Sequence, residues 1–238
     1  MRTGIGGWRW HVDVDGLVDL VARGLREGAD PAKAAPMAAY LKTDAPFYGA
    51  QKAVRVPVRR EAIRRFPPAD RDDYRQAVLA LWGQPHREER YLAIDYARSF
   101  PKYITLSSVP LYRKMITEGA WWDCVDTVAV HLVGHVLLSQ RDSMTPRIRE
   151  WIDDADMWLR RSAIIGQIGH KEATDTELLF DACARRMHET EFFIRKAIGW
   201  ALREYAKTNP SAVVAFATEH RDELSGLSFR EATKHLDV

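Results

Sequence analysis

Three short stretches decide the fold of this chain: E-R-Y-L-A at 89–93, L-R-R-S-A at 159–163 and I-R-K-A-I at 194–198. Each has arginine at its second position, and the three arginines are separated by multiples of 35 residues. A period near 35 residues is typical of short helix pairs that stack into an α-solenoid. One such pair cannot bury its apolar face alone, so the repeat predicts a stack of pairs along the chain.

Helical patterns also fill the sequence between these stretches. Segments with apolar residues at i, i+3, i+4 and i+7 alternate with short breaks rich in Pro, Gly, Asp or Ser. We expect helices near 12–27, 31–43, 56–66, 71–83, 86–100, 106–118, 121–139, 145–153, 156–169, 174–188, 191–208, 210–222 and 228–236. Only 54–58 has a β-like character, and Pro57 argues against a strand there. The sequence therefore predicts one all-α domain over residues 1–238, an α-solenoid of HEAT-like repeats with a concave basic groove.

Composition sets wider limits. The 238 residues include 35 Lys and Arg against 33 Asp and Glu, so the net charge of +2 does not by itself indicate a nucleic-acid-binding protein. There is no apolar run of about 18 residues and no secretory signal pattern. The two cysteines, Cys124 and Cys183, lack CxxC spacing. We expect a monomer without membrane contact, located in the cytoplasm, and associated with the nucleoid in a prokaryote.

The repeat aligns four positions on one side of successive helix pairs. They are Tyr91, Asp126, Arg161 and Lys196. Equivalent helices of a solenoid line one surface, so basic side chains would surround a single carboxylate there. This arrangement suits a phosphate-binding groove that holds one catalytic acid.

Trp122 and Asp126 lie four residues apart, which places both on one side of a helix. Trp121 and Val125 form a neighbouring and more buried pair. The simpler interpretation makes Trp122 a core residue and Asp126 a solvated carboxylate near a helix N-terminus. Spacing alone favours that simpler interpretation.

Trp200 is followed on its helical face by Arg203 and Lys207, at i+3 and i+7. Such a face can hold flat or cationic groups on the ring and phosphates on the cations. By itself the pattern better fits a tryptophan at a helix seam with cations that snorkel to solvent. Arg160 and Arg161, in the W-L-R-R stretch, are either phosphate contacts or parts of a salt-bridged surface.

Two other chemistries are open to the sequence. His131 and His135 are i and i+4, a spacing that suits zinc, with Asp123 and Asp126 nearby. The stretch reads HLVGH and lacks the glutamate of HExxH, and the second His lies in an apolar stretch, so a core or hydrogen-bonded histidine fits it better. No lysine lies in an apolar run of the kind that lowers a pKa for Schiff-base chemistry.

Over nearly its whole length the chain resembles the AlkD-type DNA alkylation repair glycosylases. The resemblance is carried by P-M-A-A-Y-L-K at 36–42, F-Y-G at 47–49, L-W at 81–82, R-E at 87–88, W-W-D-C-V-D at 121–126, W-L-R-R-S-A-I at 158–164 and F-I-R-K-A-I-G-W-A-L-R-E-Y at 193–205. It implies a HEAT-like solenoid that holds duplex DNA in a basic groove. It also implies excision of N3- and N7-alkylated purines without a metal or other cofactor, through contacts to backbone and sugar.

The resemblance assigns roles to particular residues. The family's catalytic trio falls on Trp122, Asp126 and Trp200, its groove arginine on Arg161, and its later cations on Arg203 and Lys207. Arg160 and Lys196 complete the cations that we expect to bind DNA. The segment 51–60 departs from the family pattern, so Gln51 has no assigned role and the path of a loop there is open. A non-catalytic HEAT-repeat scaffold is the alternative, and it would leave the trio as structure.

Overall fold

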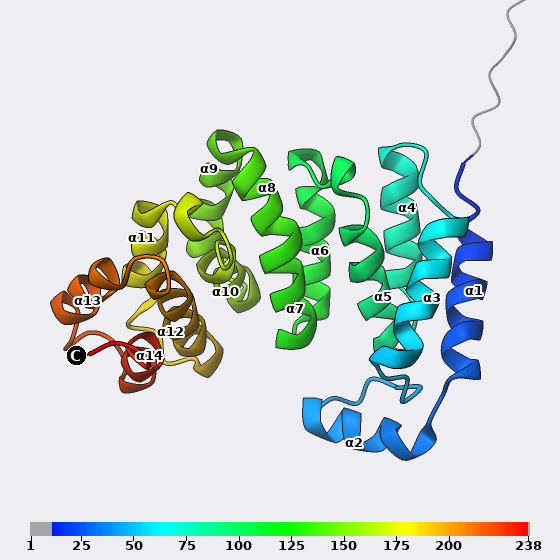
Figure 1. The fold of residues 1–238 in the computed structure, drawn as a ribbon, viewed down its shortest axis with the longest axis horizontal. Coiled ribbons are helices and arrows are strands. Elements are labelled where there is room, and N and C mark those ends of the chain that lie inside the picture. The colour runs from blue at the N-terminus through cyan, green and yellow to red at the C-terminus, as the bar shows by residue number, and fades with distance from the viewer. Residues whose placement is uncertain (1–10, 238) are drawn as a thin grey trace, which may run out of the picture. The chain divides into compact units, whose positions relative to one another are not determined.

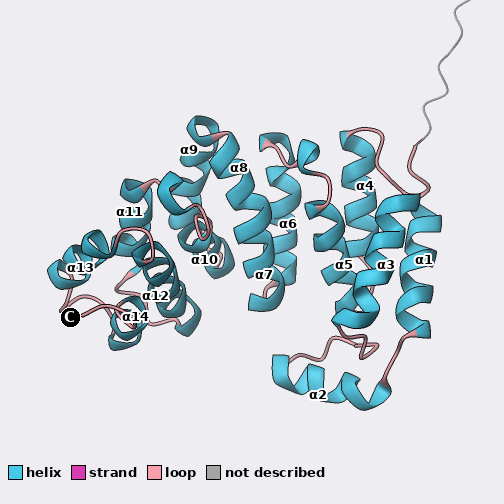
Figure 2. Ribbon diagram, in the orientation of Figure 1, coloured by secondary structure: helices cyan, strands magenta, loops and turns pink. Residues whose placement is uncertain are grey.

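A computed structural model describes residues 11–237. Within that range every regular element is helical, as the sequence predicts (Figure 2). The α-helices are α1 (Val14–Glu27), α2 (Pro31–Leu41), α3 (Lys52–Arg65), α4 (Arg71–Trp82), α5 (Arg87–Arg98), α6 (Val109–Gly119), α7 (Trp122–Val128), α8 (Gly134–Ser139), α9 (Arg141–Ile152), α10 (Met157–Ile165), α11 (Thr176–Arg186), α12 (Phe192–Ala206), α13 (Pro210–Glu219) and α14 (Gly226–Ala232). Shorter helical turns are η1 (Pro101–Tyr103), η2 (Leu106–Ser108), η3 (Ala129–Val133) and η4 (Lys171–Ala173). No helix among the described residues is both long and apolar enough to cross a membrane.

The described residues form two compact units, the first ending at Tyr103 and the second beginning at Ile104. In the first unit α1 packs on α3 and α4, and α5 packs on α3 and α4. In the second unit the helices follow one another side by side from α6 to α14 (Figure 1). Here α10 contacts α7 and α12, and α12 contacts α14. This stacking of alternate helices is the α-solenoid arrangement that the period predicts.

Side chains one period apart meet in this stack. Arg161 on α10 pairs with Asp126 on α7, and Lys196 on α12 pairs with Glu231 on α14, each over 35 residues. In the first unit the Arg55 guanidinium of α3 lies 4.9 Å from the centre of the Tyr91 ring of α5. The period therefore fixes which side chains of neighbouring repeats face each other.

The helix predicted at 56–66 begins four residues earlier than expected and includes the 54–58 stretch of β-like character. Helix α3 begins at Lys52 and runs through Pro57. Val54 packs against Gly28, the C-cap residue of α1, and Val58 packs against Gly24 within α1: a Cβ atom at Gly28 would lie 2.4 Å from Val54, and one at Gly24 would lie 2.7 Å from Val58. The packing of these half-buried valines helps to offset the backbone hydrogen bond that Pro57 cannot donate.

Helix α9 shows the same departure from the prediction. It begins at Arg141, four residues before the expected start, and it contains Pro146. In both α3 and α9 the proline is the sixth residue, so a single turn precedes it and only one hydrogen-bond donor is lost. The expected break before Pro146 is therefore absent.

Helix α14 packs closely on α12 because residue 199 is glycine. A Cβ atom at Gly199 would lie 2.4 Å from the Cβ of Glu231 and 3.0 Å from the carbonyl oxygen of Ser228. The Ser228 hydroxyl donates a hydrogen bond to the carbonyl of Arg195 at this contact. Gly199 thus determines how near Glu231 comes to the exposed face of α12.

Gly199→Ala should lower the free energy of unfolding by about 1–3 kcal/mol, the usual cost of overpacking a close contact. The loss should persist although alanine favours a helix interior by roughly 1 kcal/mol. Denaturant unfolding measures it. Gly83→Ala is the control, because its nearest neighbour would be at an ordinary 3.4 Å. Equal stability of Gly199→Ala and the unmodified protein would contradict this account of the α12–α14 contact.

Candidate active site

An aromatic cluster aligns the N-terminal ends of α7, α10 and α12. Trp121, the residue before α7, has its ring centre 6.0 Å from that of Trp158 and 5.2 Å from that of Phe193. The Trp158 and Phe193 rings are 4.9 Å apart. These three residues lie near the N-terminal ends of their helices, so their packing places the following residues of the three helices side by side. The expected buried partner of Trp121, Val125, is fully buried.

Asp126 and Arg161, which follow Trp121 and Trp158 in the sequence, form a bidentate ion pair between α7 and α10. The Arg161 Nε donates to Oδ1 at 2.7 Å, and Nη2 donates to Oδ2 at 2.8 Å. Arg161 also donates from Nη1 to the carbonyl of Phe193, whose ring lies 5.8 Å from the guanidinium carbon. The Arg161 side chain is only 6% exposed, whereas the Asp126 side chain is 17% exposed. The predicted groove arginine is therefore a buried partner of the predicted catalytic acid.

Burial dominates the protonation of Asp126. It raises the pKa of the Asp126 carboxyl above its ordinary value, while the hydrogen bonds and the charge of Arg161 oppose that rise. The charge of Asp123 raises the pKa slightly further. Without Arg161 this carboxylate would be a buried and unpaired charge, which is one of the costliest arrangements in a protein.

Trp200 lies half-buried on α12, and its face carries Lys196 four residues before it and Arg203 three residues after it. Glu231 of α14 joins these two cations. Its Oε1 accepts from the Lys196 Nζ at 2.8 Å, and its Oε2 accepts from the Arg203 Nη1. The hydrogen bond from Lys196, followed by the charges of both cations and the bond from Arg203, holds the pKa of Glu231 below its ordinary value.

Glu231 was not among the residues that the sequence indicated. Its position is Lys196 plus one period, so extending the aligned register by one more repeat would have found it. What the register does not give is its second partner, Arg203. That contact depends on how closely α14 packs on α12.

The remaining predicted cations are also paired within the second unit. Lys207, which is 62% exposed, binds both carboxylate oxygens of Glu204 at 2.7 Å. Arg160 donates from Nε and Nη2 to Glu189 and from Nη1 to the carbonyls of Asp154 and Ala155. Because all three nitrogens of its guanidinium have internal acceptors, Arg160 braces the loop before α10.

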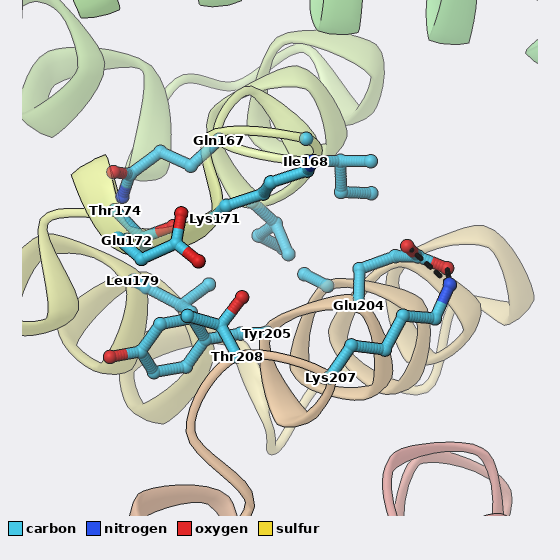
Figure 3. A pocket seen from close by; sticks show the side chains of 13 residues that line it. Gln167, Ile168, Lys171, Glu172, Thr174, Leu179, Glu204, Tyr205, Lys207 and Thr208 are labelled. Carbon is cyan, nitrogen blue, oxygen red and sulfur yellow. Dashed lines mark hydrogen bonds and ion pairs between the residues drawn. The ribbon is translucent and has the colours of Figure 1, made fainter.

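A cavity of about 420 Å³ lies beside Lys207, between α12 and the segment that follows α10. In Figure 3 the Glu204–Lys207 ion pair stands at one side of it, and Gln167, Lys171 and Glu172 stand at the other. None of Trp122, Asp126 and Trp200 lines this cavity. The predicted trio therefore does not act from inside it.

The zinc interpretation of His131 and His135 finds no support. His131 is exposed and lies in η3, a π-helical turn, while His135 lies half-buried in α8. Among residues 11–237, no group of three or more His, Cys, Asp or Glu side chains is arranged to hold a metal ion.

The fold and the sequence agree on a family. Residues 21–236 match the family of DNA alkylation repair enzymes. A solved structure described as a predicted DNA alkylation repair enzyme from Enterococcus faecalis aligns with a TM-score of 0.79 and 31% identity, over 87% of this chain and 96% of that chain. The chain belongs to the DNA alkylation repair enzyme family.

A second solved structure, smu.31 from Streptococcus mutans UA159, shares the fold. It aligns with a TM-score of 0.60 and 16% identity, over 75% of this chain and 91% of that chain. No curated protein matches the chain.

Arg161→Met should raise the pKa of Asp126 above its already raised value, because the main group that stabilises the carboxylate is lost. Carboxyl ¹³C NMR titration measures this shift. Arg161→Lys keeps the charge but loses the bidentate geometry, so its rise should be smaller. Arg149→Met is the control, since Arg149 pairs with Asp181 and Glu177 and not with Asp126. An unchanged Asp126 pKa in Arg161→Met would contradict the assignment.

The same shift has a consequence for stability. Because the folded-state pKa of Asp126 lies above that of the unfolded chain, protonation of this group favours the folded state. Proton binding to Asp126 therefore adds to the free energy of unfolding at low pH. This stabilisation is lost as the pH rises through the folded-state pKa of Asp126.

Proposed function

We propose that this protein is a monofunctional DNA glycosylase that hydrolyses the N-glycosidic bond of cationic N3- or N7-alkylated purines in duplex DNA. Membership of the DNA alkylation repair enzyme family supports a role in alkylation repair. The observation that carries the finer proposal is the Asp126 carboxylate. It lies on α7, the helix that also carries Trp122, and Arg161 of α10 holds it in place. No metal or other cofactor takes part in the proposed reaction.

The chemistry requires little more than a placed carboxylate. Alkylation gives the purine a positive charge, so when the C1′–N bond breaks its electron pair neutralises the departing base. The deoxyribose left behind is oxocarbenium-like. Asp126 stabilises that cation and orients a water molecule, whose oxygen bonds to C1′ and whose proton passes to the carboxylate.

Arg161 sets the direction of the carboxylate. The guanidinium of Arg161 occupies one lone pair on each carboxylate oxygen of Asp126 and leaves the remaining lone pairs available. Two unit charges about 4 Å apart interact by roughly 4 kcal/mol at an effective dielectric near 20, or about three decades in rate. The positive charge of Arg161 would cancel much of this if it lay equally close to the sugar. Asp126 is the more exposed partner, so the carboxylate faces the accessible side.

Trp122 and Trp200 supply flat π faces for the developing positive charge of the sugar. We infer that binding runs through the DNA backbone and the sugar, in keeping with the absence of the trio from the cavity beside Lys207. Selectivity then comes from the lability of the cationic lesion itself.

DNA phosphates must compete for the cations of the second unit. Every predicted DNA-binding cation there has a carboxylate partner: Arg160 with Glu189, Arg161 with Asp126, Lys196 and Arg203 with Glu231, and Lys207 with Glu204. Lys196, Arg203 and Lys207 are the candidates for exchange, because their ion pairs are more exposed than that of Arg161. Binding should therefore weaken steeply with salt.

Asp126→Asn should slow single-turnover release of 7-methylguanine and 3-methyladenine from methylated duplex DNA by about three decades, measured with EDTA present. Trp122→Ala and Trp200→Ala should cost much less. Asp123→Asn makes the same change one turn earlier on α7 and serves as the control. Uracil in the same duplex should not be released. Base release by Asp126→Asn at the wild-type rate would contradict the mechanism. If the wild type binds DNA in a salt-sensitive way but releases no base, the non-catalytic scaffold is favoured.

Glu231→Gln should tighten binding to unmodified duplex DNA by about tenfold. A carboxylate about 5 Å from a phosphate costs roughly 1–3 kcal/mol at effective dielectrics between 80 and 20, and this variant removes it. Fluorescence anisotropy at low salt measures the affinity. Glu177→Gln is the matched control, because Glu177 is 84% exposed and pairs with Arg149 only. Weaker binding by Glu231→Gln would show instead that Glu231 positions Lys196 and Arg203 for DNA.

A further inference from the structure

Helix α3 of the first unit carries six basic residues and one acidic residue. Lys52, Arg55 and Arg59 follow one another at i, i+3 and i+7, which places them on one face of the helix. Within residues 11–237, neither Arg55, Arg59 nor Arg60 has a carboxylate partner. This is the reverse of the second unit, where each predicted DNA-binding cation is ion-paired.

A cavity of about 370 Å³ lies between α3 and α5, and arginines dominate its lining. Its residues are Arg59, Arg60, Ile63, Asp95, Arg98 and Ser99. The one carboxylate, Asp95, lies 3.6 Å from Arg98 on its own helix, which leaves Arg59 and Arg60 uncompensated. One helical turn earlier on α3, Arg55 lies over the Tyr91 ring of α5.

These arginines differ from an ordinary solvated basic face. The Nε atoms of Arg55 and Arg59 are buried, and neither has a hydrogen-bond partner. A buried N–H group without an acceptor costs free energy, and like charges in one cavity repel each other. An anion with several acceptor oxygens would satisfy the donors and neutralise the charge together. Phosphate suits the planar fork of arginine in this way.

We propose that Arg55, Arg59, Arg60 and Arg98 form a phosphate-binding site of the first unit that holds the backbone of duplex DNA. The identity of the partner as DNA rests on the proposed function. All residues of the α3–α5 site belong to the first unit, whereas Trp122, Asp126 and Trp200 belong to the second. It also gives a role to the 51–60 segment, the part of the sequence that departs from the family pattern.

The length of the basic face favours a strand of phosphates over a single small anion. From Lys52 to Arg59 the helix rises roughly 10 Å, at about 1.5 Å per residue. The phosphates of one DNA strand advance by about 3.4 Å along the duplex axis per nucleotide. The cations therefore match several successive phosphates, whereas free phosphate would contact only one or two of them.

The double variant Arg59→Gln/Arg60→Gln tests the site by anisotropy titration of a labelled, undamaged duplex at several salt concentrations. The dissociation constant should rise at least about tenfold, and the slope of log K against log salt should fall by about 2, close to 0.9 per lost phosphate contact. Arg64→Gln/Arg65→Gln is the matched control. It also removes two positive charges from α3, but from the last turn of the helix, where Arg64 is already paired with Glu61. Equal losses in the two double variants would overturn the proposal.

A second arm separates DNA from small anions. Arginine Nε–H resonances of the wild type should shift on addition of a short duplex and show no saturable shift with millimolar inorganic phosphate. Saturable binding of inorganic phosphate, together with unchanged DNA affinity in Arg59→Gln/Arg60→Gln, would overturn the proposal in favour of a small-anion site. Melting temperatures equal to that of the wild type would exclude unfolding as the cause of lost binding.

The same variants distinguish this inference from the proposed function. With protein saturating over methylated DNA, the control Arg64→Gln/Arg65→Gln should release base at the wild-type rate constant, because these two residues lie outside the α3–α5 site and the reacting carboxylate belongs to the other unit. If the wild type releases no base but Arg59→Gln/Arg60→Gln still loses DNA affinity, the glycosylase proposal fails and the phosphate site stands. If base release is normal and Arg59→Gln/Arg60→Gln binds like its control, the phosphate site fails alone.

Discussion

The ion pair between Asp126 and Arg161 is the interaction on which the rest of the site depends. It joins two helices 35 residues apart and holds both oxygens of a carboxylate in one orientation. The aromatic cluster supports this ion pair because it aligns α7, α10 and α12. The Phe193 carbonyl supports it further because it accepts a hydrogen bond from Arg161. A charge this deeply buried is tolerated only with such a partner, so the sequence at 161 is constrained by the acid at 126.

The same geometry recurs along the chain with different chemistry at each step. One period separates Asp126 from Arg161 and Lys196 from Glu231, and nearly one period separates Arg55 from Tyr91. The solenoid stacks equivalent positions, and the residue type at each position decides whether the contact is an ion pair or a cation over a ring. In this way a single repeat produces a compensated surface in the second unit and an uncompensated basic one on α3.

This distribution of charge explains how a chain of net charge +2 can act on a polyanion. The predicted DNA-binding cations of the second unit already have carboxylate partners, so in the proposed function DNA phosphates would replace those partners at little net gain. In the proposed scheme, attraction at longer range comes from Arg55, Arg59 and Arg60 of α3, for which the described residues supply no carboxylate partner. Affinity and chemistry are in this view assigned to different parts of the chain.

The sequence by itself determined the all-helical fold, the 35-residue period and the alignment of Asp126 with Arg161, because periodic apolar positions and equal spacing are properties of the chain alone. Only the tertiary structure decided which ion pairs the charged side chains form. Arg161 was expected to face phosphates, yet it is buried against Asp126; Glu231 was missed because its contact with Arg203 requires the close packing that Gly199 permits. Likewise α3 continues through Pro57 because Val54 and Val58 fit against glycines within and just after α1. Burial and close packing depend on neighbours far along the chain, and for that reason local propensity did not reveal them.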